Sequence, residues 1–311
     1  MLLKKLFTRR KLWSIAIYKI ENERDIFQLS NCKPFYFIGE CGFRSDFKYQ
    51  ATNADPFLFV HEERIYVFYE IQTDFGVGEI WAHSMDSVGV WISHGRVLKE
   101  DFHLSYPQVF AFDRKIWMIP ESASSGKVWL YVAELFPNRW RRVRVLINEP
   151  LVDPSIFINN EGIYLFGTTR DNNLRLYFAK DINESFILVV NSVTSDKAIS
   201  RNGGRPLFIE NSLYRVAQNC STSYGQNIIL LRIKHITKNK YIEEVEINDL
   251  YVEKPKWMSE GYHHLSVVEC NNGLFVAVDG MRKDIFINTV SLVFLKFLYK
   301  LLPFTNYFNL K

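Results

Sequence analysis

The chain has 311 residues, of which 48% are hydrophobic and 15% aromatic, which is enough apolar material for a large core. Its formal net charge is only +4, too small to indicate a nucleic-acid-binding protein unless the charge is concentrated locally. The four cysteines, Cys32, Cys41, Cys220 and Cys270, are irregularly spaced and include no C-x-x-C pair, so neither a zinc site nor a disulfide framework is indicated. A reducing cytosol is the simpler environment for them.

The N-terminal segment, MLLKKLFTRRKLWSIAIYKI, is basic and interspersed with apolar residues. It lacks the continuous apolar segment and the small-residue cleavage site of a secretory signal. We therefore expect a cytoplasmic protein in which residues 1–33 form a basic, apolar lead-in to the folded domain.

A pattern about fifty residues long then occurs five times. At or next to its start each copy has a residue followed by Pro, or by Leu265 in the fifth copy. It continues through an apolar strand, a polar turn and an aromatic-rich returning strand that ends on a polar side chain. The copies lie at 54–70, 106–121, 153–169, 205–218 and 263–280. Units of this length are typical of four-stranded propeller blades. The sequence therefore predicts an all-β fold, a five-bladed β-propeller over residues 34–284.

Alternating apolar residues between the copies predict the remaining strands of the blades. Third strands are expected at 78–85, 127–135, 174–180 and 227–236, with shorter fourth strands around Trp91, Trp140 and 186–190. The strand candidate at 34–40 completes or caps a blade. No helical pattern of useful length precedes the C-terminal segment, and no glycine-rich nucleotide-binding motif is present, which excludes a doubly wound α/β sheet.

The C-terminal segment is strongly apolar but contains Lys296 and Lys300. These two lysines are four residues apart and would share one side of a helix. Because a lysine within a membrane span is costly, we expect residues 285–311 to form a short apolar helix that does not cross the bilayer. The helix either lies at a membrane interface with its lysines directed to headgroups or packs under the propeller. The similar N terminus favours a peripheral position on the inner membrane.

We call the residue that directly precedes the Pro, or Leu265 in the fifth copy, the blade-start residue. These residues lie where the innermost strand of each blade enters the central channel, so they should converge on one funnel. Because proline restricts the preceding residue to extended backbone, each should be held in one geometry. The alternative is that they are polar turn residues, but their type varies within a constant frame, which favours a binding site. They are Asp55, Tyr106, Asp153, Arg205 and His264.

A second ring of polar side chains is expected from the ends of the returning strands, and these side chains should contact substrate. They are Glu70, Glu121, Gln218 and Asp279. Tyr106 and Tyr224 are candidates for stacking on a sugar, and His264 for hydrogen bonding to one. Adjacent His263 and His264 point to opposite faces of a strand, so we expect no metal ligand set. A divalent metal beside Asp279 or Glu70 stays open as the alternative.

The blade-start residues resemble those of the five-bladed propellers of glycoside hydrolase family 43. The resemblance implies that Asp55, in NADPF, is a general base and that Asp153, in VDPS, orients and tunes the acid. The fourth-blade glutamate that serves as general acid in that family has no counterpart, because residues 203–206 read GGRP. An inverting glycosidase needs an acid to protonate the leaving oxygen, so this departure argues against simple hydrolysis.

A denser resemblance covers nearly the whole propeller. It is to the N-terminal propeller domain of plant glucosamine inositolphosphorylceramide transferases, whose stand-alone bacterial relatives occur with surface-polysaccharide genes. The resemblance implies fold and family more than activity, because a separate glycosyltransferase domain follows in the plant proteins. It rests on HLSYP (103–107), MIPES (118–122), LVDPS (151–155), GGRP (203–206), HHLS (263–266) and VDG (278–280).

The arginine in place of the acid suggests a donor whose leaving group is a diphosphate, which needs a cation rather than a proton. Asp55 would then take the proton from the acceptor hydroxyl, Asp153 and Arg205 would complete the catalytic set, and Arg201 and Arg215 could add charge. The alternative for Arg205 is a salt bridge to Asp153 or Asp55.

The sequence thus predicts a glycosyltransferase-like enzyme of surface polysaccharide or glycolipid biosynthesis. Its substrate would be a sugar nucleotide or glycan, with a membrane surface or lipid-linked acceptor as partner and no nucleic acid. A first alternative is a family 43-type glycoside hydrolase in which Glu121 or Glu70 replaces the missing acid. A second is a non-catalytic glycan-binding propeller module.

Overall fold

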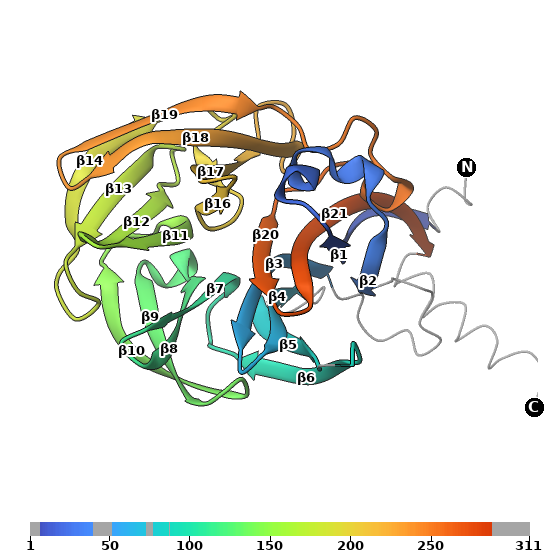
Figure 1. Ribbon diagram of the computed structural model, residues 1–311, viewed down its shortest axis with the longest axis horizontal. Coiled ribbons are helices and arrows are strands. Elements are labelled where there is room, and N and C mark those ends of the chain that lie inside the picture. Colours follow the sequence, from blue (N-terminus) through green and yellow to red (C-terminus); the bar gives the residue numbers. More distant parts are fainter. Residues whose placement is uncertain (1–6, 40–51, 73–76, 87, 288–311) are drawn as a thin grey trace, which may run out of the picture.

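The computed structural model describes residues 7–39, 52–72, 77–86 and 88–287, which form five antiparallel sheets around a centre (Figure 1). The innermost strands of neighbouring sheets contact one another, as the strands around a propeller channel do. The predicted all-β, five-bladed propeller is therefore confirmed.

Blades one to three are each built from four consecutive strands, innermost first. Blade one contains β3 (Thr52–His61), β4 (Arg64–Gln72), β5 (Glu79–Met85) and β6 (Trp91–Leu98). Blade two contains β7 (Ser105–Phe112), β8 (Lys115–Glu121), β9 (Val128–Leu135) and β10 (Arg139–Ile147). Blade three contains β11 (Val152–Asn159), β12 (Gly162–Thr168), β13 (Leu174–Ala179) and β14 (Ile187–Thr194).

Blade four has a divided innermost strand. Its strands are β15 (Arg201–Asn202), β16 (Leu207–Ile209), β17 (Ser212–Asn219), β18 (Asn227–Thr237) and β19 (Lys240–Ile247). Both β15 and β16 pair with β17, and the GGRP segment at 203–206 separates them. Proline cannot donate to a strand ladder, so pairing resumes only after Pro206.

Blade five closes the ring with both ends of the described chain. From the centre outward it contains β20 (Leu265–Cys270), β21 (Gly273–Ile287), β1 (Phe7–Ile20) and β2 (Pro34–Ile38). β1 pairs with β21 along its whole length, from Phe7 opposite Ile287 to Ile20 opposite Leu274. The N-terminal part of the chain therefore holds the last blade together.

This closure differs from two expectations. The expected lead-in over residues 1–33 contains β1, so the propeller begins well before residue 34. Residues 285–287 belong to β21 and do not begin a helix. The rest of the expected C-terminal helix, residues 288–311, lies outside the described residues. The strand candidate at 34–40 forms β2 on the outside of the fifth blade.

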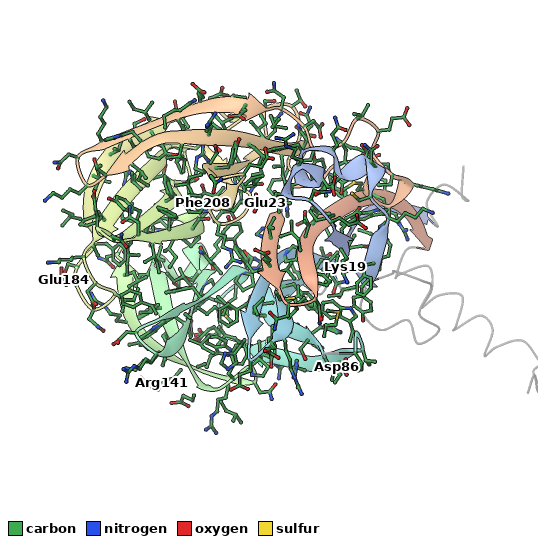
Figure 2. All side chains as sticks on the ribbon, viewed as in Figure 1. Lys19, Glu23, Asp86, Arg141, Glu184 and Phe208 are labelled. Atoms are coloured by element: carbon green, nitrogen blue, oxygen red, sulfur yellow. The ribbon has the colours of Figure 1, made fainter. Side chains whose placement is uncertain are left out.

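The hydrophobic core lies in layers between neighbouring blades rather than at the centre, and side chains fill these spaces (Figure 2). In the layer between blades five and one, Ile15 and Ile17 pack with Leu58 and Val67. Because both faces of a blade are covered, a middle strand such as β12 is buried along its whole length. Each large side chain in these layers contributes about 1.5–3 kcal/mol.

The helices in the described ranges are short 3-10 segments. They are η1 (Glu23–Asn31), η2 (Ala123–Ser125) and η3 (Lys256–Met258). Within the part of the chain that the structure describes, no helix has the length and apolarity needed to cross a bilayer.

Candidate active site in the propeller funnel

The main-chain N–H group of each of the first three blade-start residues donates a hydrogen bond to a carboxyl group from another blade. The Asp55 side chain accepts a hydrogen bond from the Tyr106 N–H, with 3.2 Å between Oδ2 and N. The Asp153 N–H donates to Glu121 Oε2 at 3.0 Å, and the Asp55 N–H donates to Asp279 Oδ2 at 3.1 Å. Carboxylates from different blades therefore meet at one end of the channel, as the repeat predicts.

The backbone at these positions is not extended, contrary to expectation. Asp55, Tyr106 and Asp153 have φ values of 55°, 48° and 47°, in the left-handed region. At each of them the strand register slips, because the residue and its proline form a β-bulge. The bulge removes the proline from the ladder and redirects the preceding side chain. Such backbone costs about 1–3 kcal/mol per residue and is concentrated at functional sites.

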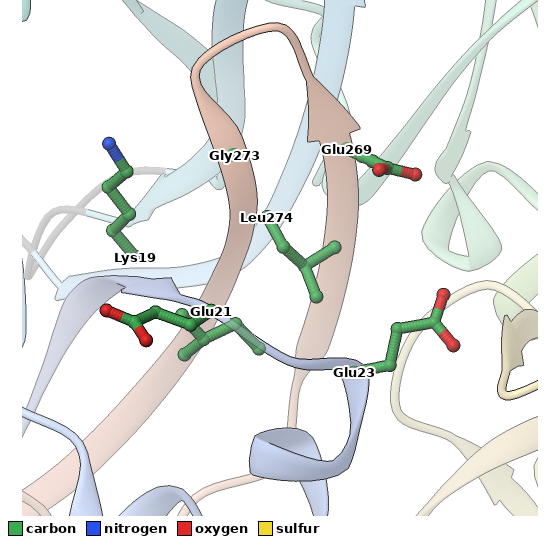
Figure 3. Close-up of a pocket in the computed structure, with 7 residues that line it drawn as sticks. Lys19, Glu21, Glu23, Glu269, Gly273 and Leu274 are labelled. Carbon is green, nitrogen blue, oxygen red and sulfur yellow. The ribbon is translucent and has the colours of Figure 1, made fainter.

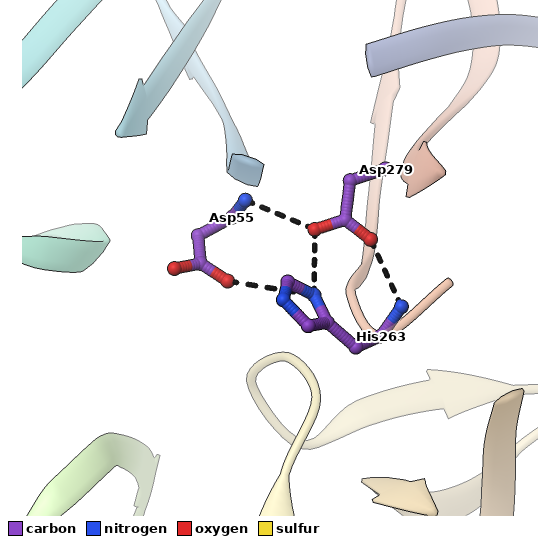
Figure 4. Close-up of side chains that lie close together, drawn as sticks. All are labelled: Asp55, His263 and Asp279. Atoms are coloured by element: carbon purple, nitrogen blue, oxygen red, sulfur yellow. Dashed lines mark hydrogen bonds and ion pairs between the residues drawn. The ribbon is translucent and has the colours of Figure 1, made fainter. Parts of the chain in front are cut away.

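Asp55 lies beside a buried cluster from blade five (Figure 4). His263 Nδ1 is 2.7 Å from Asp279 Oδ2 and 3.8 Å from Asp55 Oδ1. Burial alone would lower the pKa of His263, but the carboxylates of Asp279 and Asp55 raise it above its ordinary value. Burial opposes ionisation of Asp55 as well, yet the imidazoles of His264 and His263 hold its pKa below the usual range. Asp55 is therefore ionised at neutral pH.

The same cluster is the group most suited to an ion in the described ranges, since Asp55, His263 and Asp279 offer ligand atoms within 4.8 Å of one another. Asp279 Oδ1, however, accepts the N–H groups of His263 and His264 at 2.9 and 3.0 Å. Its Oδ2 accepts the Asp55 N–H and faces His263 Nδ1. The protein itself uses these oxygens, so the cluster does not fit a dedicated ion cage. A divalent metal stays a prediction.

Tyr106 and His264 form the floor of the funnel together with Phe57. Both side chains are 0% exposed, and their ring centroids are 5.0 Å apart. The Tyr106 hydroxyl accepts the Gly204 N–H and bonds Ser155 Oγ, each at 2.7 Å. Tyr106 therefore has no free ring face for the sugar stacking that we expected. Both ring nitrogens of His264 lack a hydrogen-bond partner among the described residues, and Nδ1 is 3.7 Å from Asp55 Oδ1.

Asp153 is held by blade four. Arg201 Nε and Nη2 each lie 2.7 Å from Asp153 Oδ2, and Gln218 Nε2 donates to the same oxygen at 2.8 Å. The Arg201 guanidinium also lies 5.2 Å from the centre of the Tyr224 ring, a side chain that is 44% exposed. Gln218 and Tyr224 thus lie in the predicted site. The principal cation of the funnel is Arg201, for which the sequence suggested only an accessory role. Arg201 lies opposite Gln218 in the strand register, and this pairing brings it to the predicted site.

Arg205 does not make the predicted contacts. Its Nη2 donates to the main-chain carbonyls of Leu58 and Val267, at 3.2 and 3.1 Å. These carbonyls lie on β3 and β20, further along the inner strands than the blade-start residues. Innermost strands are sheet edges with unpaired carbonyls, and Arg205 satisfies two of them. Burial lowers its pKa to about 10.

Arg205 therefore joins blade four to blades one and five. No ion pair between its guanidinium and a carboxylate occurs in the described ranges, so the alternative of a salt bridge to Asp55 or Asp153 is wrong. Arg215 does not add charge to the funnel either. It is fully buried and bonds Glu243 with two nitrogens, each at 2.7 Å.

Glu70 and Glu121 are the funnel carboxyl groups whose pKa is raised. Burial raises the pKa of Glu70 well above its ordinary value, and the charges of the other funnel carboxylates raise it further. Burial and the charge of Asp153 raise the pKa of Glu121 in the same way, against the opposing effect of Arg201. Glu70 Oε1 is 3.3 Å from His103 Nε2. Since His103 Nδ1 accepts the Gly78 N–H at 2.9 Å, Nε2 carries the hydrogen.

Comparison with known proteins places this geometry in a family. Residues 34–281 match the family described as glucosamine inositolphosphorylceramide transferase 1, N-terminal. The chain belongs to this family. It is 35% identical over 252 residues to glucosamine inositolphosphorylceramide transferase 1 of Oryza sativa subsp. japonica, covering 74% of this chain and 33% of the relative. The relative from Arabidopsis thaliana is 34% identical over 246 residues, with 74% and 32% covered. The chain spans about a third of the length of these curated relatives.

Solved structures share the fold at low identity. RS223 β-xylosidase has a TM-score of 0.55 at 12% identity, with 74% of this chain and 91% of that chain covered. CoXyl43, a GH43 β-xylosidase/α-arabinofuranosidase from a compost microbial metagenome in complex with xylotriose, has a TM-score of 0.53 at 13% identity, with 74% and 90% covered. Both resemblances inferred from the motifs, to the plant transferase domain and to the family 43 propeller fold, are confirmed.

In this member of the transferase-domain family, blade four has no room for an acid at the two glycines. A Cβ on Gly203 would lie 2.6 Å from the His263 carbonyl oxygen, and one on Gly204 would lie 2.1 Å from that of Leu265. The approach is fixed by the Leu265 N–H, which donates to the Gly203 carbonyl at 2.7 Å. A proton donor in the funnel therefore cannot come from these two positions.

A separate pocket of about 370 Å³ lies away from these residues, at the β20–β21 turn (Figure 3). Its charged lining residues are Lys19, Glu21, Glu23 and Glu269. None of them is a predicted site residue, and the funnel carboxyl groups are not part of it. The candidate site is therefore the funnel.

Proposed function

We propose that this propeller binds a glycan in its funnel and transfers a glycosyl group to an acceptor hydroxyl, with Asp55 as general base and Glu121 as general acid. The observation that carries the proposal is that the pKa values of two carboxyl groups in one buried site are shifted in opposite directions. The pKa of Asp55 is lowered, whereas that of Glu121 is raised well above its ordinary value. Environments that separate the pKa values of two carboxyl groups in this way are typical of acid–base pairs.

The proton transfers follow from the hydrogen bonds. Asp55 Oδ2 accepts the Tyr106 N–H, so Oδ1 takes the proton of the acceptor hydroxyl as the new bond to the sugar forms. Glu121 Oε2 accepts the Asp153 N–H, so Oε1 carries the proton that passes to the leaving oxygen. Arg201, held by Asp153, then stabilises the Glu121 carboxylate. The proton left on Asp55 returns to Glu121 through solvent after product release.

The charge of the funnel supports a sugar donor with a neutral or cationic group. The carboxyl groups of Asp55, Glu121, Asp153 and Asp279 all raise the pKa of Glu70. Arg201 and His263 supply the cations against them. A diphosphate would be repelled there, whereas an amine-bearing sugar would be attracted. The word glucosamine in the names of the relatives agrees with such a sugar.

A second candidate is a glycan-binding module that presents its ligand to a separate glycosyltransferase. It is supported by the family match, which is to an N-terminal region of relatives named as transferases. Tyr224, exposed beside Arg201, would offer a stacking surface in either function.

The test compares turnover with binding. Purified protein is incubated with aryl glucosaminides and oligosaccharide acceptors, products are identified by mass spectrometry, and glycan binding is measured by calorimetry. Asp55→Asn and Glu121→Gln should each reduce turnover by about 10²–10⁴-fold while binding persists. Glu184→Gln, on the exposed outer edge of blade three (Figure 2), is the control and should behave as wild type. Glycan binding without turnover in any protein would favour the binding module.

A further inference from the structure

We propose that the two ends of this chain, joined by β1 and β21, dock the propeller on an anionic membrane surface at the outer edge of blade five. The joining is a consequence of the strand register. β2 pairs with β1 only at Ile15–Tyr18, and β20 pairs with β21 only at Gly273–Val278. Within the described ranges, residues 7–12 and 282–287 therefore pair as strands with each other alone. They form a two-stranded ribbon beyond the blade (Figure 1).

This ribbon and its flanking segments are basic, whereas the rest of the protein is acidic. Residues 1–11 contain five basic and no acidic residues, and residues 282–311 contain five basic residues and Asp284 as their one acid. Their combined net charge is +9, whereas the whole chain carries +4, so residues 12–281 carry −5. The modest total charge therefore conceals a basic end and an acidic body.

The partner follows from the composition of the basic segments. Leucine and phenylalanine are interspersed with the basic residues in both of them, and isoleucine and valine also occur in residues 282–311. A nucleic acid would require cations without these apolar side chains, whereas an anionic bilayer surface attracts both kinds of residue. The β1–β21 register places Phe7 opposite Ile287, so both segments leave the propeller at the same point. The two basic, apolar segments can therefore contact the same membrane surface together.

The position of Trp13 places the base of the ribbon beside the funnel. This residue pairs with Met281 at the base of the ribbon, and its ring stacks on His263 in the funnel wall, with centroids 4.1 Å apart. β21 passes from Asp279 in the funnel to Met281 and on to Ile287, and six strand residues span about 20 Å. The ribbon thus projects from the funnel side. Figure 1 shows the ribbon running outward from blade five, so a membrane held at its tip lies beside the blade that supplies His263 and Asp279 to the funnel.

Vesicle co-sedimentation of the full chain tests the charge contribution. Vesicles contain phosphatidylcholine alone or phosphatidylcholine with phosphatidylglycerol. Arg9→Gln/Lys11→Gln should weaken binding to the anionic vesicles roughly thirtyfold, since each cation near the surface contributes about 1 kcal/mol. The matched control, Lys238→Gln/Lys240→Gln, removes two exposed cations at the β18–β19 turn, away from the chain ends (Figure 1), and should leave binding unchanged.

Hydrogen exchange with anionic vesicles tests which part of the protein contacts the membrane. Amides of 7–12 and 282–287 should exchange more slowly, and those of the β18–β19 turn should not change. Asp55→Asn should bind vesicles as wild type does, so the outcome is independent of the catalytic proposal. Equal weakening by both double variants, equal binding to neutral vesicles, or protection spread over the β18–β19 turn would each overturn the proposal.

Discussion

Blades one to three and blade four use the same position of the repeat in different ways. In the first three blades, the blade-start residue lies in a left-handed bulge and remains at the funnel or in its floor. In blade four the inner strand is divided, and Arg205 bonds main-chain carbonyls of two other blades. Arg201, from the short strand before the break, reaches the funnel instead. A repeat can therefore lose a functional position without losing the blade, provided that a neighbouring residue occupies the space.

The largest effect should come from removing the cation that blade four supplies. Arg201→Met leaves the Asp153 carboxylate buried without its charged partner, and breaking a buried pair costs about 3–5 kcal/mol. Arg205→Met removes only hydrogen bonds to carbonyls and should cost clearly less. Urea unfolding of both variants measures the difference. Arg201→Lys keeps the charge and should recover part of the lost stability. Equal losses in the free energy of unfolding for Arg201→Met and Arg205→Met would show that the two arginines stabilise the propeller equally.

The next effect concerns the close approach of blades four and five. Gly204→Ala should destabilise the protein by about 2–4 kcal/mol, because its Cβ would meet the Leu265 carbonyl oxygen at 2.1 Å in a conformation that favours glycine. Gly126→Ala is the control, since Gly126 also has positive φ but no atom within 4 Å of an added Cβ. It should cost only about 1 kcal/mol, the strain of the backbone. Similar losses in the two unfolding curves would remove the steric explanation.

The smallest effect is the pH dependence of stability. The folded-state pKa of Glu121 is raised, so the folded protein holds this proton more tightly than the unfolded chain does. This contribution is complete below the ordinary glutamate value and is lost as pH rises through the raised value. Glu121→Gln should therefore flatten the fall in melting temperature over that window, with little change at lower pH. A wild-type curve without such a fall, or an identical fall in the variant, would argue against a buried, protonated Glu121.

The architecture and the location of the site were predictable, because a repeat of this length with alternating apolar residues is a local signal. Asp55, Asp153 and Asp279 lie together as the repeat placed them. The N-terminal strand β1 was not foreseen, because its pairing with β21 joins opposite ends of the chain. The direction of Arg205 was missed for another reason. It depends on the backbone path through Gly203 and Gly204, and residue types alone do not determine that path.

The division of roles between Asp55 and Glu121 can be measured most directly with two donors of the same sugar. An alkyl glucosaminide has a poor leaving group that must be protonated, whereas the fluoride ion of glucosaminyl fluoride leaves without help from an acid. The account predicts that Glu121→Gln loses activity on the alkyl glycoside but retains most of it on the fluoride, and that Asp55→Asn loses both. A Glu121→Gln variant equally impaired on the two donors, or equally active on them, would contradict the assignment of Glu121 as the acid of this funnel.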